Sequence, residues 1–96
     1  IQMNVVWTEN SEYTLNEIIE YIEIKFGLLA AQDYYFDVIS VVNSISIKPE
    51  IFPIYQLKTQ VRKAVINKKT ILYYKTSYDN LYLLGFYDTR KEIHKF

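Results

Sequence analysis

Hydrophobic residues recur with two different spacings along the first third of the chain. Met3, Val5 and Trp7 occupy every second position, which predicts a β-strand with one buried face. The spacing then changes to three and four residues, which predicts a helix with a single apolar stripe. That stripe consists of Leu15, Ile18, Ile19, Ile22 and Phe26.

Polar residues at both ends of this stripe indicate where the helix starts and stops. We expect the helix to begin between Ser11 and Thr14, because either hydroxyl suits an N-cap and Thr14 stands three residues before Glu17. Gly27 suits the left-handed conformation that often ends a helix. A second helix is predicted over residues 28–44, so the two should form an antiparallel hairpin. Its expected buried residues are Ala31, Tyr35, Val38, Val42 and Ile45.

The second half of the chain returns to period two after Pro49 and Pro53. Residues 54–58, 61–66, 70–75 and 80–87 read as four strands, and polar residues at 67–69 and 77–79 supply turns between the last three. We therefore expect one α+β domain over residues 1–96. In it the helical hairpin packs on one face of a small antiparallel sheet, and the N-terminal strand joins its edge.

Composition excludes several classes of site and location. The 96 residues include no cysteine, which excludes disulfides and thiolate zinc ligands and fits a reducing cytoplasm. One histidine and scattered carboxylates give no metal-ligand spacing, and two glycines give no phosphate-binding loop. We expect no metal and no cofactor. The apolar runs are also too short to span a membrane.

The net charge of zero conceals two oppositely charged halves. Residues 1–47 carry one base and seven acids, so their charge is 1 − 7 = −6. Residues 48–96 carry ten bases and four acids, so theirs is 10 − 4 = +6. Either the positive half attracts a polyanion or an acidic partner, or the two halves attract each other within one fold.

An ordered set of short segments in the strand region resembles one known family. Residues 49–53 read PEIFP, 61–66 read VRKAVI, 71–75 read ILYYK and 83–90 read LLGFYDTR. Residues 6–8, Ile22 and the pair Phe26-Gly27 match the opening strand and first helix of the same family. Together these segments resemble the RelE/ParE toxins of type II toxin–antitoxin systems, in particular their plasmid-stabilisation branch.

The resemblance implies a toxin that a cognate antitoxin holds inactive, with an acidic antitoxin segment docking on the positive half. RelE-like members cut messenger RNA in the ribosome, and this is the first interpretation. ParE-like members inhibit DNA gyrase without cleaving RNA, which is the second. A third is a weakly toxic protein that chiefly binds its antitoxin. A shared fold does not choose among them.

Candidate catalytic residues follow from what ribonuclease chemistry needs, namely a proton donor or acceptor and cations around the phosphate. Arg62 and Arg90 are the only two arginines, and a guanidinium binds phosphate in a bidentate way. In RelE-like ribonucleases an arginine follows the last strand, as Arg90 does. His94 is the only side chain whose ordinary pKa suits proton transfer near neutrality.

The alternative for each of these three residues is structural: an ion pair or an antitoxin contact for Arg62, an exposed ion pair for Arg90, and solvation for His94. Candidate contacts for RNA or a partner protein lie close to the arginines or in the predicted strands. They are Tyr55, Lys63, Tyr87 and Lys91.

Two departures from the family pattern count against a ribonuclease. Active members usually carry a basic residue at the opening of the strand that here starts Thr70-Ile71. Six residues beyond Arg90, where a catalytic tyrosine would fall, the chain has Phe96, which has no proton to donate.

Overall fold

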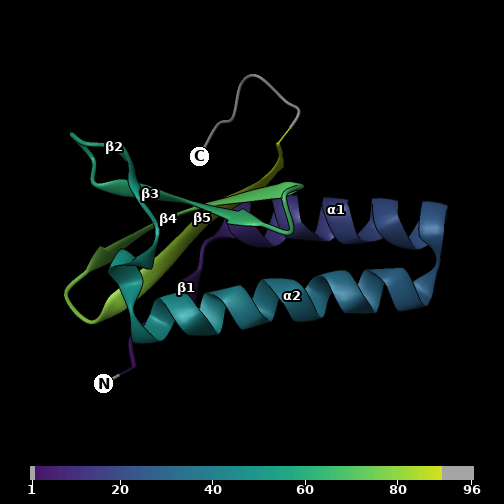
Figure 1. Ribbon diagram of the computed structural model, residues 1–96, viewed down its shortest axis with the longest axis horizontal. Coiled ribbons are helices and arrows are strands. Elements are labelled where there is room, and N and C mark those ends of the chain that lie inside the picture. The colour runs from purple at the N-terminus through teal and green to yellow at the C-terminus, as the bar shows by residue number, and fades with distance from the viewer. Residues whose placement is uncertain (1, 90–96) are drawn as a thin grey trace.

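Two helices and five strands follow one another in the computed structural model, which describes residues 2–89 (Figure 1). The order is β1 (Asn4–Trp7), α1 (Glu9–Phe26), α2 (Leu28–Ile47), β2 (Ile54–Gln56), β3 (Val61–Ile66), β4 (Thr70–Ser77) and β5 (Asn80–Asp88). A short 3-10 helix, η1 (Pro49–Ile51), connects α2 to β2. The α+β class and the helical hairpin are confirmed.

The strands form one sheet in the order β1-β5-β4-β3-β2. Strands β2 to β5 make the expected antiparallel meander, and β1 joins its edge as expected. However, β1 runs parallel to β5, with Asn4 opposite Asn80 and Trp7 opposite Leu83. The sheet is therefore mixed, and the expectation of a wholly antiparallel sheet is wrong. Alternating hydrophobicity predicts a buried face and carries no information about strand direction.

Helix α1 begins earlier than its capping residues suggested. The N-cap is Thr8, whose Oγ1 accepts a hydrogen bond from the Ser11 amide at 3.1 Å. Ser11 itself is buried inside the first turn and donates its hydroxyl to the Thr8 carbonyl at 2.8 Å. The predicted start between Ser11 and Thr14 is therefore wrong, because the two hydroxyls are used for other contacts.

Helix α2 continues one turn beyond the predicted end at Ser44. Ile45 is fully buried and lies on the same stripe as Val38 and Val42, so burying it extends the helix to Ile47. Tyr35, which was predicted to be buried, is 47% exposed, and Phe26, the last residue of the predicted apolar stripe of the first helix, is 65% exposed. Phe26 is the last residue of α1, and Tyr35 is in the first half of α2. The turn between the two helices lies at the end of the hairpin that extends away from the sheet (Figure 1).

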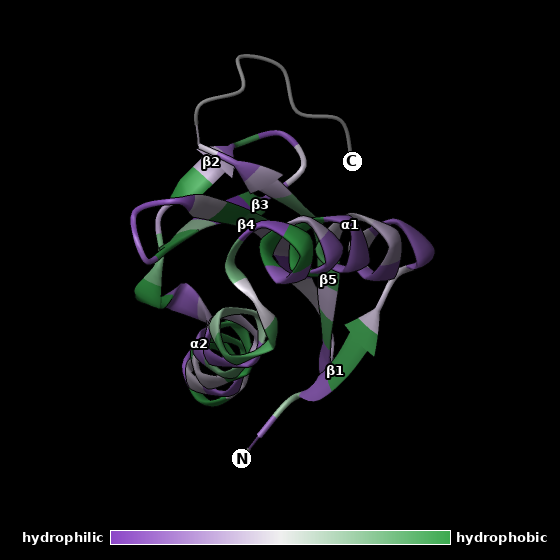
Figure 2. Ribbon diagram, turned by 90° about the vertical axis from the view of Figure 1, so that its right-hand side faces the viewer, coloured by the Kyte–Doolittle hydropathy of each residue, from purple (hydrophilic) through white to green (hydrophobic). Residues whose placement is uncertain are grey.

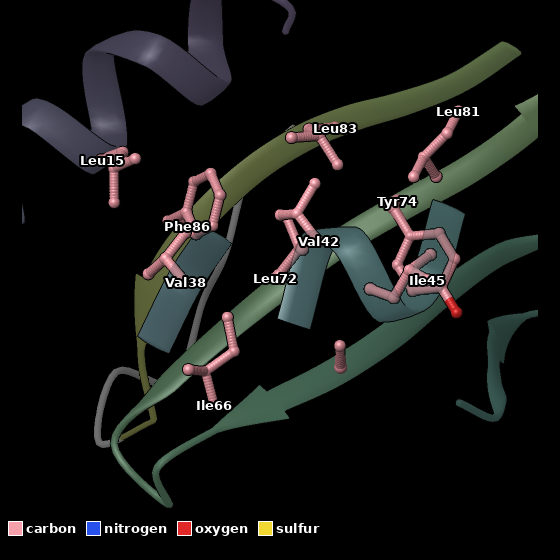
Figure 3. Packing of buried hydrophobic residues seen from close by; sticks show 11 residues of the cluster. Leu15, Val38, Val42, Ile45, Ile66, Leu72, Tyr74, Leu81, Leu83 and Phe86 are labelled. Atoms are coloured by element: carbon pink, nitrogen blue, oxygen red, sulfur yellow. The ribbon is translucent and has the colours of Figure 1, made fainter. Parts of the chain in front are cut away.

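The main core lies between the hairpin and one face of the sheet (Figure 3). Leu15 of α1 and Val38, Val42 and Ile45 of α2 pack there against inward-facing strand residues. Figure 2 shows both helices on the same side of the sheet. No helix in the described part of the chain is long and apolar enough to cross a membrane.

A β-bulge in β5 keeps two core residues on the same face. Tyr73 is opposite Gly85 and Tyr74 is opposite Leu83, so Leu84 has no counterpart on β4. Leu83 and Phe86 are three positions apart and would face opposite sides of a regular strand. With the extra residue between them, both are buried in the core, at 0% and 1% exposure.

The edge of β5 is completed by α1 where β1 ends. Strand β1 pairs with β5 only as far as Leu83. From there Thr8 donates its hydroxyl to the Leu83 carbonyl at 2.6 Å, and Asn10 donates its Nδ2 to the Leu84 carbonyl at 2.8 Å. The Phe86 amide donates to Thr14 Oγ1 at 2.9 Å. Side chains of the helix thus satisfy backbone groups that a neighbouring strand would otherwise bind.

Replacing Thr14 by valine should lower the free energy of unfolding by about 1–3 kcal/mol, because the buried Phe86 amide then loses its acceptor. Thr14→Ser keeps the hydroxyl and is the matched control, with a change below about 1 kcal/mol. Urea unfolding of the three proteins measures both values. Equal stability of the valine and serine variants would contradict this role of the hydroxyl.

Candidate functional site: the open face of the sheet

The sheet face turned away from the helices carries a small second cluster of buried residues. Val61, Ile71 and Tyr73 form it, and the partly buried Leu84 and Tyr87 pack against it. These side chains alternate along β3, β4 and β5 with those of the main core. We call this surface the open sheet face.

Three tyrosines from three different strands lie in a row on the open sheet face. The ring centroids of Tyr55 and Tyr73 are 4.9 Å apart, and those of Tyr73 and Tyr87 are 5.8 Å apart. Both pairs are tilted by 57°, within the range in which aromatic rings attract each other. Tyr73 lies between the other two rings and is 1% exposed, whereas Tyr55 is 52% exposed. We call these three residues the tyrosine row.

A positive charge lies at one end of the tyrosine row. Lys63 is opposite Tyr73 in the β3–β4 register, and its Nζ lies 5.6 Å from the centre of the Tyr55 ring. An ammonium group at that distance is attracted to the ring face. Lys63 and Tyr55 therefore present a cation and a half-exposed aromatic ring together.

The other end of the row is held by α1. Tyr87 Oη accepts a hydrogen bond from Asn10 Nδ2 at 2.9 Å. The Tyr87 ring lies across Gly85, where an added Cβ would come within 2.7 Å of Tyr87 Cε2 and of Asn10 Nδ2. Because Gly85 has no side chain, the Tyr87 ring and the Asn10 amide can occupy the space beside its Cα.

Arg62 lies on the opposite side of the sheet from Lys63. Its register partner is Tyr74, a residue of the main core. The guanidinium Nη1 donates to the Phe52 carbonyl at 2.7 Å, and Tyr74 donates its hydroxyl to the Pro49 carbonyl at 2.6 Å. Burial raises the pKa of Tyr74, although the Arg62 charge opposes that shift. Arg62 and Tyr74 together fix the connection between α2 and β2.

The structure brings together three of the seven residues predicted from the sequence. Tyr55, Lys63 and Tyr87 share the open sheet face, and Arg62 does not. Arg90, Lys91 and His94 lie outside the described residues. No group of three or more potential ligands for a metal ion occurs within residues 2–89.

Sequence reasoning missed three residues of this site. Tyr73 looked like any strand tyrosine, although it connects the other two rings. Asn10 gave no signal, because its partners Leu84 and Tyr87 lie more than 70 positions away. Only Gly85 could have been found from the sequence, since an isolated glycine within a strand often marks a bulge or a place where another group comes close to the backbone.

Comparisons with known proteins give a result for the fold. No protein-family model matches the chain, and no curated protein matches it by sequence. Among solved structures, it is similar to a chain of the structure titled "Chromosomal ParDE TA system from P. aeruginosa", with a TM-score of 0.71. The sequences are 15% identical, and the match covers 91% of this chain and 96% of that chain. The two chains therefore share their fold over nearly their whole lengths.

Ionisation of Tyr73 should lower the stability of the protein at high pH. Burial raises the pKa of Tyr73 from 10.0 to about 12, and Tyr55 adds to the shift. A raised pKa in the folded protein means that this contribution to stability is complete below pH 10 and is lost as the pH rises towards 12. When the pH is raised from 8 to 11, the free energy of unfolding of the Tyr73→Phe variant should therefore fall less than that of the unmodified chain.

Tyr78→Phe is the control for this pH series, because Tyr78 is 97% exposed. Urea unfolding at several pH values should show the Tyr78 variant following the unmodified chain. A Tyr73 variant with the same pH dependence as the unmodified chain would contradict the assignment. Tyr34, whose pKa burial also raises to about 12, remains present in every protein and contributes equally.

Proposed function

We propose that this chain is the toxin component of a type II toxin–antitoxin system. Two independent observations support the proposal: the shared fold with a chain of a ParDE system and the ordered RelE/ParE-like segments of the sequence. The proposed partner is a cognate antitoxin. An acidic segment of it would dock on the positive half of the chain, and salt would weaken that contact.

Of the two modes of action, we favour inhibition of DNA gyrase by binding, as in ParE-like toxins. The observation that carries this choice is the position of Arg62. Its guanidinium is bound to the Phe52 carbonyl on the core side, so it does not join Lys63 around a phosphate on the open sheet face. The open sheet face offers instead a row of contacting aromatic rings with a lysine beside it, which suits contact with another macromolecule.

Ribosome-dependent cleavage of messenger RNA is the second candidate. The half-exposed ring of Tyr55 beside Lys63 favours it, because bases stack on aromatic faces and lysine attracts the phosphate backbone. In that mechanism Arg90 would stabilise charge on the phosphate, His94 would transfer the proton, and Tyr87 and Lys91 would contact RNA.

Two assays with the purified chain distinguish these modes. If it is a ParE-like inhibitor, it should block DNA supercoiling by gyrase and leave cell-free translation intact. Adding the antitoxin should restore supercoiling. Blocked translation with cut messages and active gyrase would contradict gyrase inhibition and support cleavage. Activity of both systems, together with harmless expression in cells, would contradict the toxin role.

The double variant Tyr55→Ala/Lys63→Glu should weaken growth inhibition at least about tenfold, which corresponds to a loss of about 1.4 kcal/mol in target binding. The change removes the exposed ring and reverses the charge beside it. Lys25→Glu on α1 is the control, since it reverses a lysine charge away from the sheet. Equal loss in both variants would show that overall charge, rather than the open sheet face, determines toxicity.

A further inference from the structure

The turn between β2 and β3 exposes a leucine at the edge of the sheet. This turn comprises residues 57–60, and Leu57 at its start is 75% exposed. Two apolar residues of β2, just before the turn, are also open to solvent: Tyr55 is 52% exposed and Ile54 is 38% exposed. Three large apolar side chains within four positions thus contact water. Exposed apolar side chains grouped in this way are typical of a binding site.

Hydrogen bonds within the turn support its conformation. The carbonyl oxygen of Leu57 accepts two of them from Gln60, one from the backbone amide at 3.3 Å and one from Nε2 at 2.8 Å. Thr59 donates its hydroxyl to the side chain of Gln56. Gln60 has a φ of 60°, in the left-handed region that residues other than glycine seldom adopt. A turn supported in this way loses less entropy on binding than an unsupported one.

The surroundings of Leu57 are positively charged. Residues 48–69 carry six bases and one acid, so their charge is 6 − 1 = +5. Lys58 follows Leu57 directly, and the Nζ of Lys63 lies 5.6 Å from the centre of the Tyr55 ring. Figure 1 shows the β2–β3 turn at the end of the molecule opposite the turn between the two acidic helices. The β2–β3 turn therefore presents an apolar side chain together with cations.

We propose that the β2–β3 turn inserts Leu57 into an apolar pocket of the toxin's target protein, and that carboxylates border this pocket. The inference rests on the proposed function, because the turn continues the contact surface that Tyr55 and Lys63 form on the open sheet face. The pocket buries the leucine side chain, and its carboxylates attract Lys58. Leu57 is then a specificity-determining residue, since a protein without such a pocket leaves it in water.

The same observations disfavour two other occupants. A second copy of this turn would bring the same positive charge and be repelled. An anionic membrane would attract the lysines, but the single leucine of the turn adds little to such binding, since even a myristoyl chain holds a protein on a membrane only marginally. A pocket in a protein surrounds one leucine on all sides and therefore makes better use of it.

Binding of purified DNA gyrase to the immobilised full chain, measured by surface plasmon resonance, tests the proposal. Leu57→Ala should weaken this binding at least about tenfold, whereas Leu57→Met keeps the apolar volume and should change it less than about threefold. Leu29→Ala is the matched control, because Leu29 is 77% exposed and lies in the first turn of α2. Inhibition of supercoiling should follow the same order.

Two further measurements separate the charge beside the leucine from the antitoxin contact. Lys58→Glu should weaken gyrase binding more at low salt than at high salt, because salt screens the attraction to carboxylates. Lys25→Glu on α1 is its control. Calorimetric titration with the cognate antitoxin should give Leu57→Ala the affinity of the unmodified chain. Circular dichroism of each variant checks that the fold is retained.

A folded Leu57→Ala variant that binds gyrase as tightly as the unmodified chain would overturn the proposal and leave the toxin role intact. Loss of antitoxin binding with unchanged gyrase binding would also overturn it, since the turn would then contact the antitoxin. So would anionic vesicles that bind the unmodified chain but not this variant, because the leucine would then insert into a membrane. An unmodified chain that neither binds nor inhibits gyrase would contradict the favoured mode of action and this inference together. Selective loss in the Leu57→Ala and Lys58→Glu variants is the supporting result.

Discussion

The fold depends on the way α1 completes the edge of β5. Strand β1 is only four residues long, so the second half of β5 has no strand neighbour on the edge opposite β4. The side chains of Thr8, Asn10 and Thr14 bind the backbone of β5 there. The backbone groups of an exposed strand edge lack hydrogen-bond partners in the protein, and such an edge can pair with a strand of another molecule. The first turns of α1 prevent both, because their side chains bind these groups and cover the edge. The same contacts fix the direction in which the hairpin leaves the sheet.

This attachment also determines what the two faces of the sheet present. One face is buried under the hairpin, and Arg62 and Tyr74 hold the connection to β2 on that side. The other face carries the tyrosine row, and Asn10 anchors its last ring from α1. Acidic side chains are concentrated on the hairpin and most basic ones on the sheet region. The acidic and the basic halves of the sequence thus fall largely in two different layers of the molecule.

Periodicity predicted the elements of this fold well, because apolar spacing reflects burial directly. It predicted both helices, the meander and the edge position of the N-terminal strand. It failed where distant residues decide the outcome. The cap at Thr8 and the role of Thr14 depend on β5, more than 70 positions later. Phe26 and Tyr35 follow the apolar pattern of their helices, yet the sheet does not reach them.

In the candidate site, too, single residues could be predicted from the sequence, whereas their contacts with distant residues could not. Tyr55, Lys63 and Tyr87 were chosen as single residues, and the structure places them on one face. Their connection through Tyr73 requires the register of three strands, including the bulge opposite Tyr73. Arg62 had the residue type of a phosphate ligand, but period two alone did not indicate which face its strand turned to the core.

Native-state hydrogen exchange of the Phe86 amide tests the attachment of α1 to β5 most directly. This amide donates to a side chain of α1 and belongs to no strand ladder on that edge. If α1 completes the edge, the amide should exchange as slowly as the paired amides of β4 and β5, which open only in global unfolding. Exchange as fast as that of amides in the 77–79 turn would contradict the account.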